Sequence, residues 1–114
     1  MNRATRAASR TIHSRAIAHR PPRFKFCLYV AGGAQNSAQA LVNLATLCRE
    51  HLADRHDTEI VDVFREPKRA LADGIFMTPT LVRLAPAPVR RIVGTLSQTQ
   101  TVLQAMDMDM DAAA

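Results

Sequence analysis

The cysteines and histidines are the side chains with which this chain could do redox chemistry or bind a metal. Cys27 and Cys48 lie too far apart in the sequence to form a CxxC motif. Because no apolar secretory segment precedes them, we expect buried, reduced thiols in a cytoplasmic protein, with a structural disulfide as the less favoured alternative. No Cys/His cluster has zinc spacing, and His51 and His56 would diverge by about 140° on one helix. The sequence therefore predicts neither a metal ion nor a cofactor.

Two apolar strands joined by a long amphipathic helix must position whatever site the chain has. Residues 24–30 begin by alternating and then become continuously apolar, as is typical of a buried central strand. A capping signal at Asn36 and Gln39 predicts a helix from there to about Arg55. Residues 58–64 follow as a second strand, so we expect a right-handed parallel strand–helix–strand unit.

A proline-rich second half completes the predicted fold. Pro67 opens a short helix that ends near Asp73. Residues 80–84 and 89–93 are predicted to form two further strands. Because only a short turn joins them, we expect them to pair antiparallel, with the last strand at the sheet edge. Ser97 is expected to cap a final helix. The predicted order is βαβαββα, which is the arrangement of thioredoxin-like α/β folds.

The Thr78–Pro79 bond immediately precedes the third strand. A residue before proline is restricted to extended geometry, and a proline at the mouth of a strand removes a ladder hydrogen bond. Both a cis bond and an ordinary trans turn are compatible with these residues. A thioredoxin-like domain carries its cis-proline at this place in the strand order, so we expect special backbone geometry here.

In a thioredoxin-like enzyme, the working thiol lies where the first strand meets the first helix, because the helix N-terminus lowers the thiol pKa. Here residues 32–37 read GGAQNS and contain no cysteine. Ser37 could orient a bound thiol such as glutathione, but a capping-region serine is the commoner explanation. Asp62 and Asp73 have no evident partner, and solvation at the surface accounts for both. The sequence thus predicts a binding module rather than an enzyme.

Charge is distributed unevenly along the chain. The net charge is +5, yet residues 1–25 hold seven basic and no acidic residues, which leaves the remainder at −2. We expect a basic arm without regular structure over residues 1–22, a folded domain over 23–106 and an acidic tail over 107–114. A transit peptide and a phosphate-binding arm are alternatives for the first segment, whereas the charge of the domain disfavours nucleic-acid binding. No apolar run is long enough to span a membrane.

Several motifs resemble the KaiB family of circadian clock proteins. They are LYVAG at 28–32, NS at 36–37, IVDV at 60–63, TPTL at 78–81 and PAPVRRIVG at 86–94. The resemblance covers roughly residues 24–106, and its proline-rich part is the most specific.

This resemblance implies a small non-catalytic regulator that binds the hexameric ATPase and autokinase KaiC and, in cyanobacteria, also KaiA. It further implies two folds: a thioredoxin-like monomer that binds KaiC, and a tetramer with a βαββααβ arrangement. A homo-tetramer or dimer is therefore expected. We associate Thr78, Pro79, Gly94 and Thr95 with the switch between these folds. Thr95 is a departure, because family members usually have an acidic residue there.

The family forms its KaiC-facing surface around the second strand and second helix. Carried over to this chain, the partner-binding residues are Phe64, Arg65, Glu66, Lys68, Arg69 and Asp73. An ordinary solvated helix start would contain similar residues, so both interpretations stand. The second functional hypothesis is a thioredoxin-like sensor module that docks to a histidine kinase. Neither hypothesis includes a small-molecule substrate, and a glutathione-using enzyme and a DNA-binding arm are disfavoured.

Overall fold

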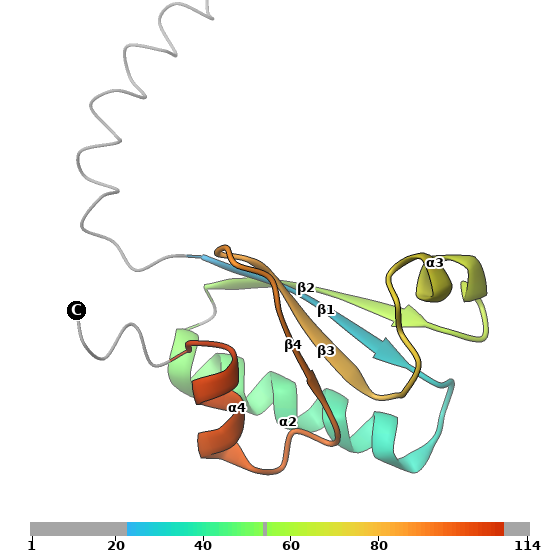
Figure 1. Cartoon of the computed structure of the whole chain (residues 1–114). Coiled ribbons are helices and arrows are strands. Elements are labelled where there is room, and N and C mark those ends of the chain that lie inside the picture. Colours follow the sequence, from blue (N-terminus) through green and yellow to red (C-terminus); the bar gives the residue numbers. More distant parts are fainter. Residues whose placement is uncertain (1–22, 54, 109–114) are drawn as a thin grey trace, which may run out of the picture.

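In the computed structural model, which describes residues 23–53 and 55–108, helices lie on both faces of one sheet (Figure 1). The elements are β1 (Phe24–Val30), α2 (Gln35–Leu52), β2 (His56–Asp62), α3 (Pro67–Ala72), β3 (Thr80–Ala85), β4 (Arg90–Val93) and α4 (Thr99–Ala105). The predicted βαβαββα order is confirmed, and each strand begins and ends within two residues of its expected position. The predicted basic arm and residues 109–114 lie outside the described residues.

The sheet is built around β1. Its strand order is β2-β1-β3-β4, so β1 has a partner on each edge. β1 is parallel to β2 because a helix connects them, and it is antiparallel to β3. Leu28 in β1 faces Ile60 on one side and Leu81 on the other. β4 is antiparallel to β3 at the sheet edge, as the sequence predicted.

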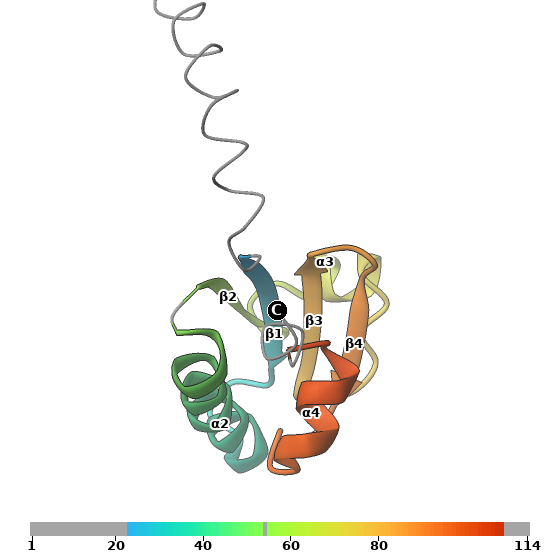
Figure 2. The ribbon, with the colours of Figure 1, turned by 90° about the vertical axis from the view of Figure 1, so that its left-hand side faces the viewer.

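Two apolar clusters pack against opposite faces of the sheet. Helices α2 and α4 cover one face (Figures 1 and 2). That cluster includes Phe24, Phe26, Leu28 and Val30 from β1, Leu44, Cys48 and Leu52 from α2, Val102 and Leu103 from α4, and Met106 just after α4. Side chains alternate along a strand, so Cys27 and Tyr29 face the other side, where they pack with Val61, Ala70 and Ile75. Helix α3 covers only one end of that second face (Figure 1).

The start of α2 differs from the prediction. Ala34 occupies the N-cap position and no side chain caps the helix, so Asn36 lies inside the first turn. A tight turn precedes the helix, since the Ala34 N–H donates to the Ala31 carbonyl at 3.1 Å. The hydroxyl of Ser37, in turn, accepts the Ala31 N–H at 3.0 Å. Ser37 is buried, and its hydroxyl has a structural partner in the loop before the helix, but it does not cap the helix.

The helix ends also differ by a few residues. Helix α2 stops at Leu52 rather than near Arg55, because Ala53 adopts a left-handed φ of 50° and the Arg55 carbonyl accepts the Phe24 N–H at 3.0 Å. Gln98 takes the N-cap position of α4 where Ser97 was predicted. The Ser97 hydroxyl is bonded to the Thr95 hydroxyl instead, at 3.0 Å.

Packing continues past the last helix. Met108 is 1% exposed and belongs to the main core cluster, although it lies within the segment that we expected to be an acidic tail. Asp107 accepts a charged hydrogen bond from Arg83 at 3.3 Å.

The Thr78–Pro79 peptide bond is cis, which decides between the two sequence interpretations. The Ala85–Pro86 and Ala87–Pro88 bonds are also cis. The carbonyl of Pro79 accepts the N–H of Gly94 at 2.9 Å, so two of the four residues assigned to the fold switch are in direct contact.

Arg83 is a buried cation that sequence reasoning missed. Its side chain is 1% exposed and lies over the Phe24 ring, with the guanidinium carbon 6.0 Å from the ring centroid. It donates to the carbonyls of Met106 at 2.6 Å and Pro88 at 2.7 Å. One side chain of β3 thereby ties the β3–β4 turn to the end of α4.

We expect Arg83→Ala to lower the free energy of unfolding by about 3 kcal/mol, because two main-chain carbonyls lose a charged donor in a buried site. Arg90→Ala is the matched control. Arg90 also approaches Asp107, at 3.4 Å, but its side chain is 47% exposed, so its loss should cost below about 1 kcal/mol. Urea unfolding of the two variants measures both values, and equal losses would contradict the role assigned to Arg83.

Candidate functional site

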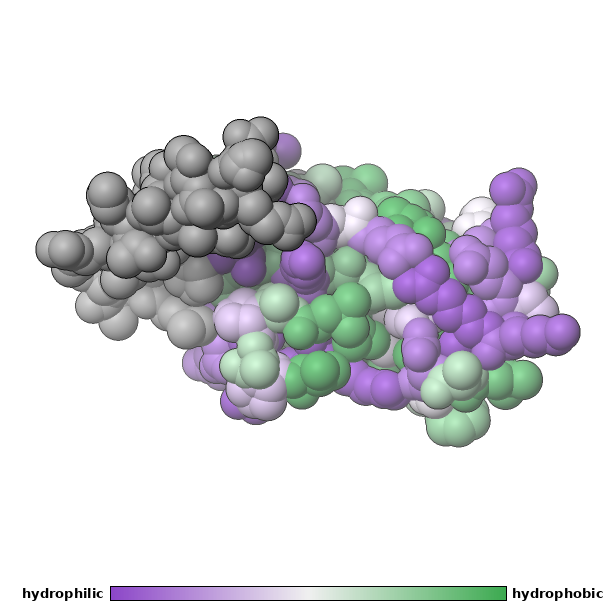
Figure 3. Space-filling view, turned by 90° about the horizontal axis from the view of Figure 1, so that it is seen from above, coloured by the Kyte–Doolittle hydropathy of each residue, from purple (hydrophilic) through white to green (hydrophobic). Residues whose placement is uncertain are grey.

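The end of the molecule that carries α3 exposes large apolar side chains, and we call it the α3 surface (residues 64–77). Phe64 is 73% exposed, Leu71 70%, Phe76 86% and Met77 64%. In Figure 3 this end lies on the right, where apolar groups alternate with long hydrophilic side chains. Large apolar groups that gather on a surface and are rimmed by polar ones are typical of protein–protein contact sites.

Phe64 and Phe76 line a common hollow of about 190 Å³. Its lining consists of Ala31, Val63, Phe64, Ile75, Phe76, Met77 and Thr78. This volume is below the range of about 300–1,000 Å³ that is usual for small-molecule pockets. The hollow therefore suits one or two side chains of a protein partner better than a separate ligand.

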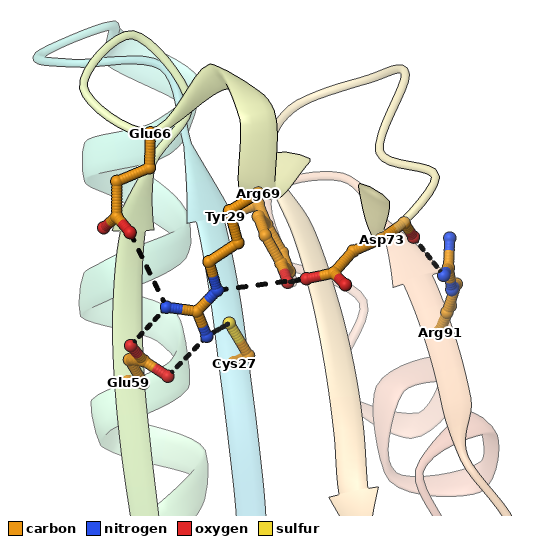
Figure 4. A network of polar contacts seen from close by, with 7 residues as sticks. All are labelled: Cys27, Tyr29, Glu59, Glu66, Arg69, Asp73 and Arg91. Atoms are coloured by element: carbon orange, nitrogen blue, oxygen red, sulfur yellow. Dashed lines mark hydrogen bonds and ion pairs between the residues drawn. The ribbon is translucent and has the colours of Figure 1, made fainter. Parts of the chain in front are cut away.

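Arg69 attaches α3 to the sheet (Figure 4). Its guanidinium donates to both carboxylate oxygens of Glu59 in β2, at 2.6 and 2.7 Å. Glu66 and Asp73 lie 3.8 and 3.9 Å from the same group. The Glu59 contact raises the pKa of Arg69, and the hydrogen bond from Arg69 lowers the pKa of Glu59. Two parallel bonds between a guanidinium and a carboxylate fix orientation as well as distance.

Asp73 is the second point of attachment. Its carboxylate accepts a hydrogen bond from the Tyr29 hydroxyl of β1 (Figure 4). Arg91 of β4 donates to the main-chain carbonyl of Asp73, and to that of Gly74 at 3.1 Å. The expectation that Asp73 is an isolated, solvated carboxylate is therefore wrong, because residues far away in the sequence converge on it.

Cys27 lies beside this network but has the properties of an inert thiol. It is 1% exposed, and burial raises its pKa, although Arg69 stands 3.9 Å from its sulfur. A thiol of raised pKa is a poor nucleophile, because the reactive species is the thiolate. Cys27 and Cys48 are both buried and neither is joined in a disulfide, as the sequence predicted.

Asp62 also has partners that were not expected. One oxygen of its carboxylate accepts the N–H of Gly32 at 3.1 Å and the N–H of Phe64 at 2.9 Å. This places the loop after β1 next to the turn after β2, at the edge of the α3 surface. The sequence gives no local signal for the first contact, since its partners are 30 residues apart.

Comparison with known proteins assigns the family. The KaiB domain model matches residues 27–108. The chain belongs to the KaiB family. The circadian clock protein KaiB3 of Synechocystis is 41% identical over 81 residues, which cover 71% of this chain and 79% of that protein. A circadian clock oscillator protein KaiB of Prochlorococcus marinus is 40% identical over 84 residues, covering 74% and 71%.

Solved structures place this KaiB-family chain among thioredoxin-like folds. The N-terminal domain of SasA from Synechococcus elongatus superposes with a TM-score of 0.65 at 15% identity, covering 81% of this chain and 88% of that one. Chloroplastic thioredoxin z gives a TM-score of 0.64 at 20% identity, with 88% and 89% covered. At these identities the likeness concerns the fold alone.

The residues carried over from the KaiB family divide into two groups. Phe64, Arg65, Glu66 and Lys68 are exposed on the α3 surface, whereas Arg69 and Asp73 are partly buried and hold α3 in place. Phe76 and Met77 were not among the predicted contact residues. The apolar run at 75–77, which precedes the cis-proline, was the available signal for them.

The part of the chain that the structure describes has neither a metal-binding cluster nor a membrane-spanning helix. No group of three or more His, Cys, Asp or Glu side chains is arranged to hold a metal ion. No described helix combines the length and apolar character that crossing a membrane requires. His13 and His19 lie outside the described residues.

Tyr29 is the only tyrosine of the chain, so its ionisation can be followed directly by ultraviolet absorbance. Burial and the bond to Asp73 raise its pKa. An unfolded tyrosine loses its proton near pH 10 while the folded one keeps it, so stability should fall as the pH rises above 10, by up to about 1.4 kcal/mol per pH unit. Tyr29→Phe should remove the part of this dependence that comes from the tyrosine and leave the part that comes from the buried Cys27 thiol. Ionisation of Tyr29 near pH 10 in the folded protein would contradict the assignment.

Proposed function

We propose that this KaiB-family protein is a non-catalytic regulator that binds a KaiC-type hexameric ATPase through the α3 surface and modulates its phosphorylation state. The observation that carries the proposal is the joint exposure of Phe64, Phe76 and Met77 around one hollow. Family membership supports the class of partner, since the curated relatives are named as clock proteins.

The α3 surface has the composition of an interface centre. Aromatic side chains that insert into a partner commonly provide most of the binding free energy, and a charged rim adds orientation. Arg65 and Lys68 supply such a rim beside Phe64. Because Glu59 and Tyr29 already hold α3 in place, little order has to be gained on binding, which favours affinity.

The non-catalytic part of the proposal is supported by the loop after β1. A thioredoxin-like enzyme would carry its reactive thiol there, and this chain has Gly32 and Gly33. The nearby thiol of Cys27 is buried and has a raised pKa. A cytoplasmic location belongs to the same proposal, as does a slow exchange with a tetrameric second fold.

The test is to mix the protein with the KaiC-type ATPase of the same source and ATP, and to follow complex formation by size-exclusion chromatography with light scattering. Phe64→Ala should weaken binding at least tenfold, about 1.4 kcal/mol, through loss of an apolar anchor. Val42→Ala is the matched control, since Val42 is 65% exposed on α2 and should leave the affinity unchanged.

Each outcome has a defined meaning. A slowly formed complex beside a free tetramer supports both the partner and the second fold, whereas rapid binding by a monomer supports the partner alone. Equal affinities of the Phe64→Ala and Val42→Ala variants would reject the α3 surface. Absence of a complex under every nucleotide condition would reject the ATPase as partner and make a histidine kinase the next to be tested.

A further inference from the structure

Asp62, the last residue of β2, holds the turn that begins the α3 surface. Its carboxylate accepts the Phe64 N–H at 2.9 Å, while its main-chain carbonyl accepts the N–H groups of Arg65 and Glu66 at 3.0 and 2.9 Å. The same carboxylate oxygen accepts the N–H of Gly32, in the loop that follows the neighbouring strand β1, at 3.1 Å. One side chain therefore joins the turn after β2 to the loop after β1.

The Phe64 ring lies against Gly32 as a consequence. A Cβ atom added to Gly32 would stand 3.4 Å from Cδ2 of that ring, whereas one added to Gly33 would meet nothing within 4 Å. Gly32 also has a φ of +53°, which L-residues with side chains rarely adopt. Phe64 as a residue nevertheless remains 73% exposed, so its side chain lies beside Gly32 and is largely open to solvent.

We propose that Asp62 is a positioning residue for partner docking: its carboxylate seats Phe64 on Gly32 and so presents the ring to the partner in one orientation. This inference rests on the proposed function. It assigns a role to the loop after β1: Gly32 of this loop packs against the Phe64 ring, whereas a thioredoxin-like enzyme has its reactive thiol in this loop. Without the carboxylate, the turn and its ring must be ordered when the partner binds, and ordering weakens affinity.

A double-mutant cycle tests whether Asp62 acts through Phe64. Asp62→Ala should weaken binding of the KaiC-type ATPase about tenfold, and Asp62→Asn should restore affinity to within about threefold, because an amide oxygen can accept both N–H groups. In a Phe64→Ala background, Asp62→Ala should have less than a twofold further effect, since the side chain that it positions is gone. An equal loss in both backgrounds, or no loss in either, overturns the positioning role.

Amide hydrogen exchange measures whether Asp62 holds the Gly32 and Phe64 amides, and it needs no partner. Asp62→Ala should speed exchange of the Gly32 and Phe64 amides at least tenfold while core amides such as Leu28 keep their rates. Gly32→Ala should weaken partner binding, and Gly33→Ala, the matched control, should not. Unchanged exchange of the two amides would overturn the proposed contact between Asp62 and these two N–H groups.

The binding outcomes separate this inference from the proposed function. Failure of the wild-type protein to bind would overturn the proposed function and the docking role together. Equal affinities of wild type and Asp62→Ala would overturn the docking role alone.

Discussion

The pairing of β1 with a strand on each edge is the constraint on which the rest of the structure depends. Burial of β1 on both faces gives the sheet its two apolar clusters, one under α2 and α4 and one under α3. The same strand places Tyr29 under Asp73, and its last carbonyl, that of Val30, accepts the Val63 N–H at 2.8 Å. The turn that carries Phe64 is thus an extension of the central strand pair rather than a free loop.

The α3 surface combines a fixed backbone with exposed apolar side chains. Arg69, Asp73 and Asp62 supply the fixation through bonds to β2, β1 and the loop after β1. The side chains of Arg69 and Glu59 remain 35% and 54% exposed, so their paired bonds mainly fix the orientation of the six-residue helix α3. Phe64, Phe76 and Met77 make no such polar bonds with their side chains and are largely exposed. Their exposure is the reason to regard this end of the molecule as a binding surface.

The sequence was sufficient for features that depend on local patterns. The apolar run of β1, Pro67 at the start of α3 and the restricted geometry at Pro79 all appear as predicted. Local capping rules failed at Asn36 and Ser97, because tertiary contacts and neighbouring hydroxyls set the helix starts. Asp62, Asp73 and Arg83 each have a partner that is distant along the chain, by 30, 44 and 23 residues respectively, and no local pattern could reveal these contacts. Alternation along β3 could have predicted that the Arg83 side chain is buried, since it places this residue on the same face of the sheet as Leu81.

Hydrogen exchange of the wild-type protein, with and without the KaiC-type ATPase and ATP, tests the central claim most directly. The account predicts slower exchange on binding across residues 62–78, with little change in the exposed face of α2 around Val42. Protection confined to α2 or α4, with residues 62–78 unchanged in a formed complex, would contradict it.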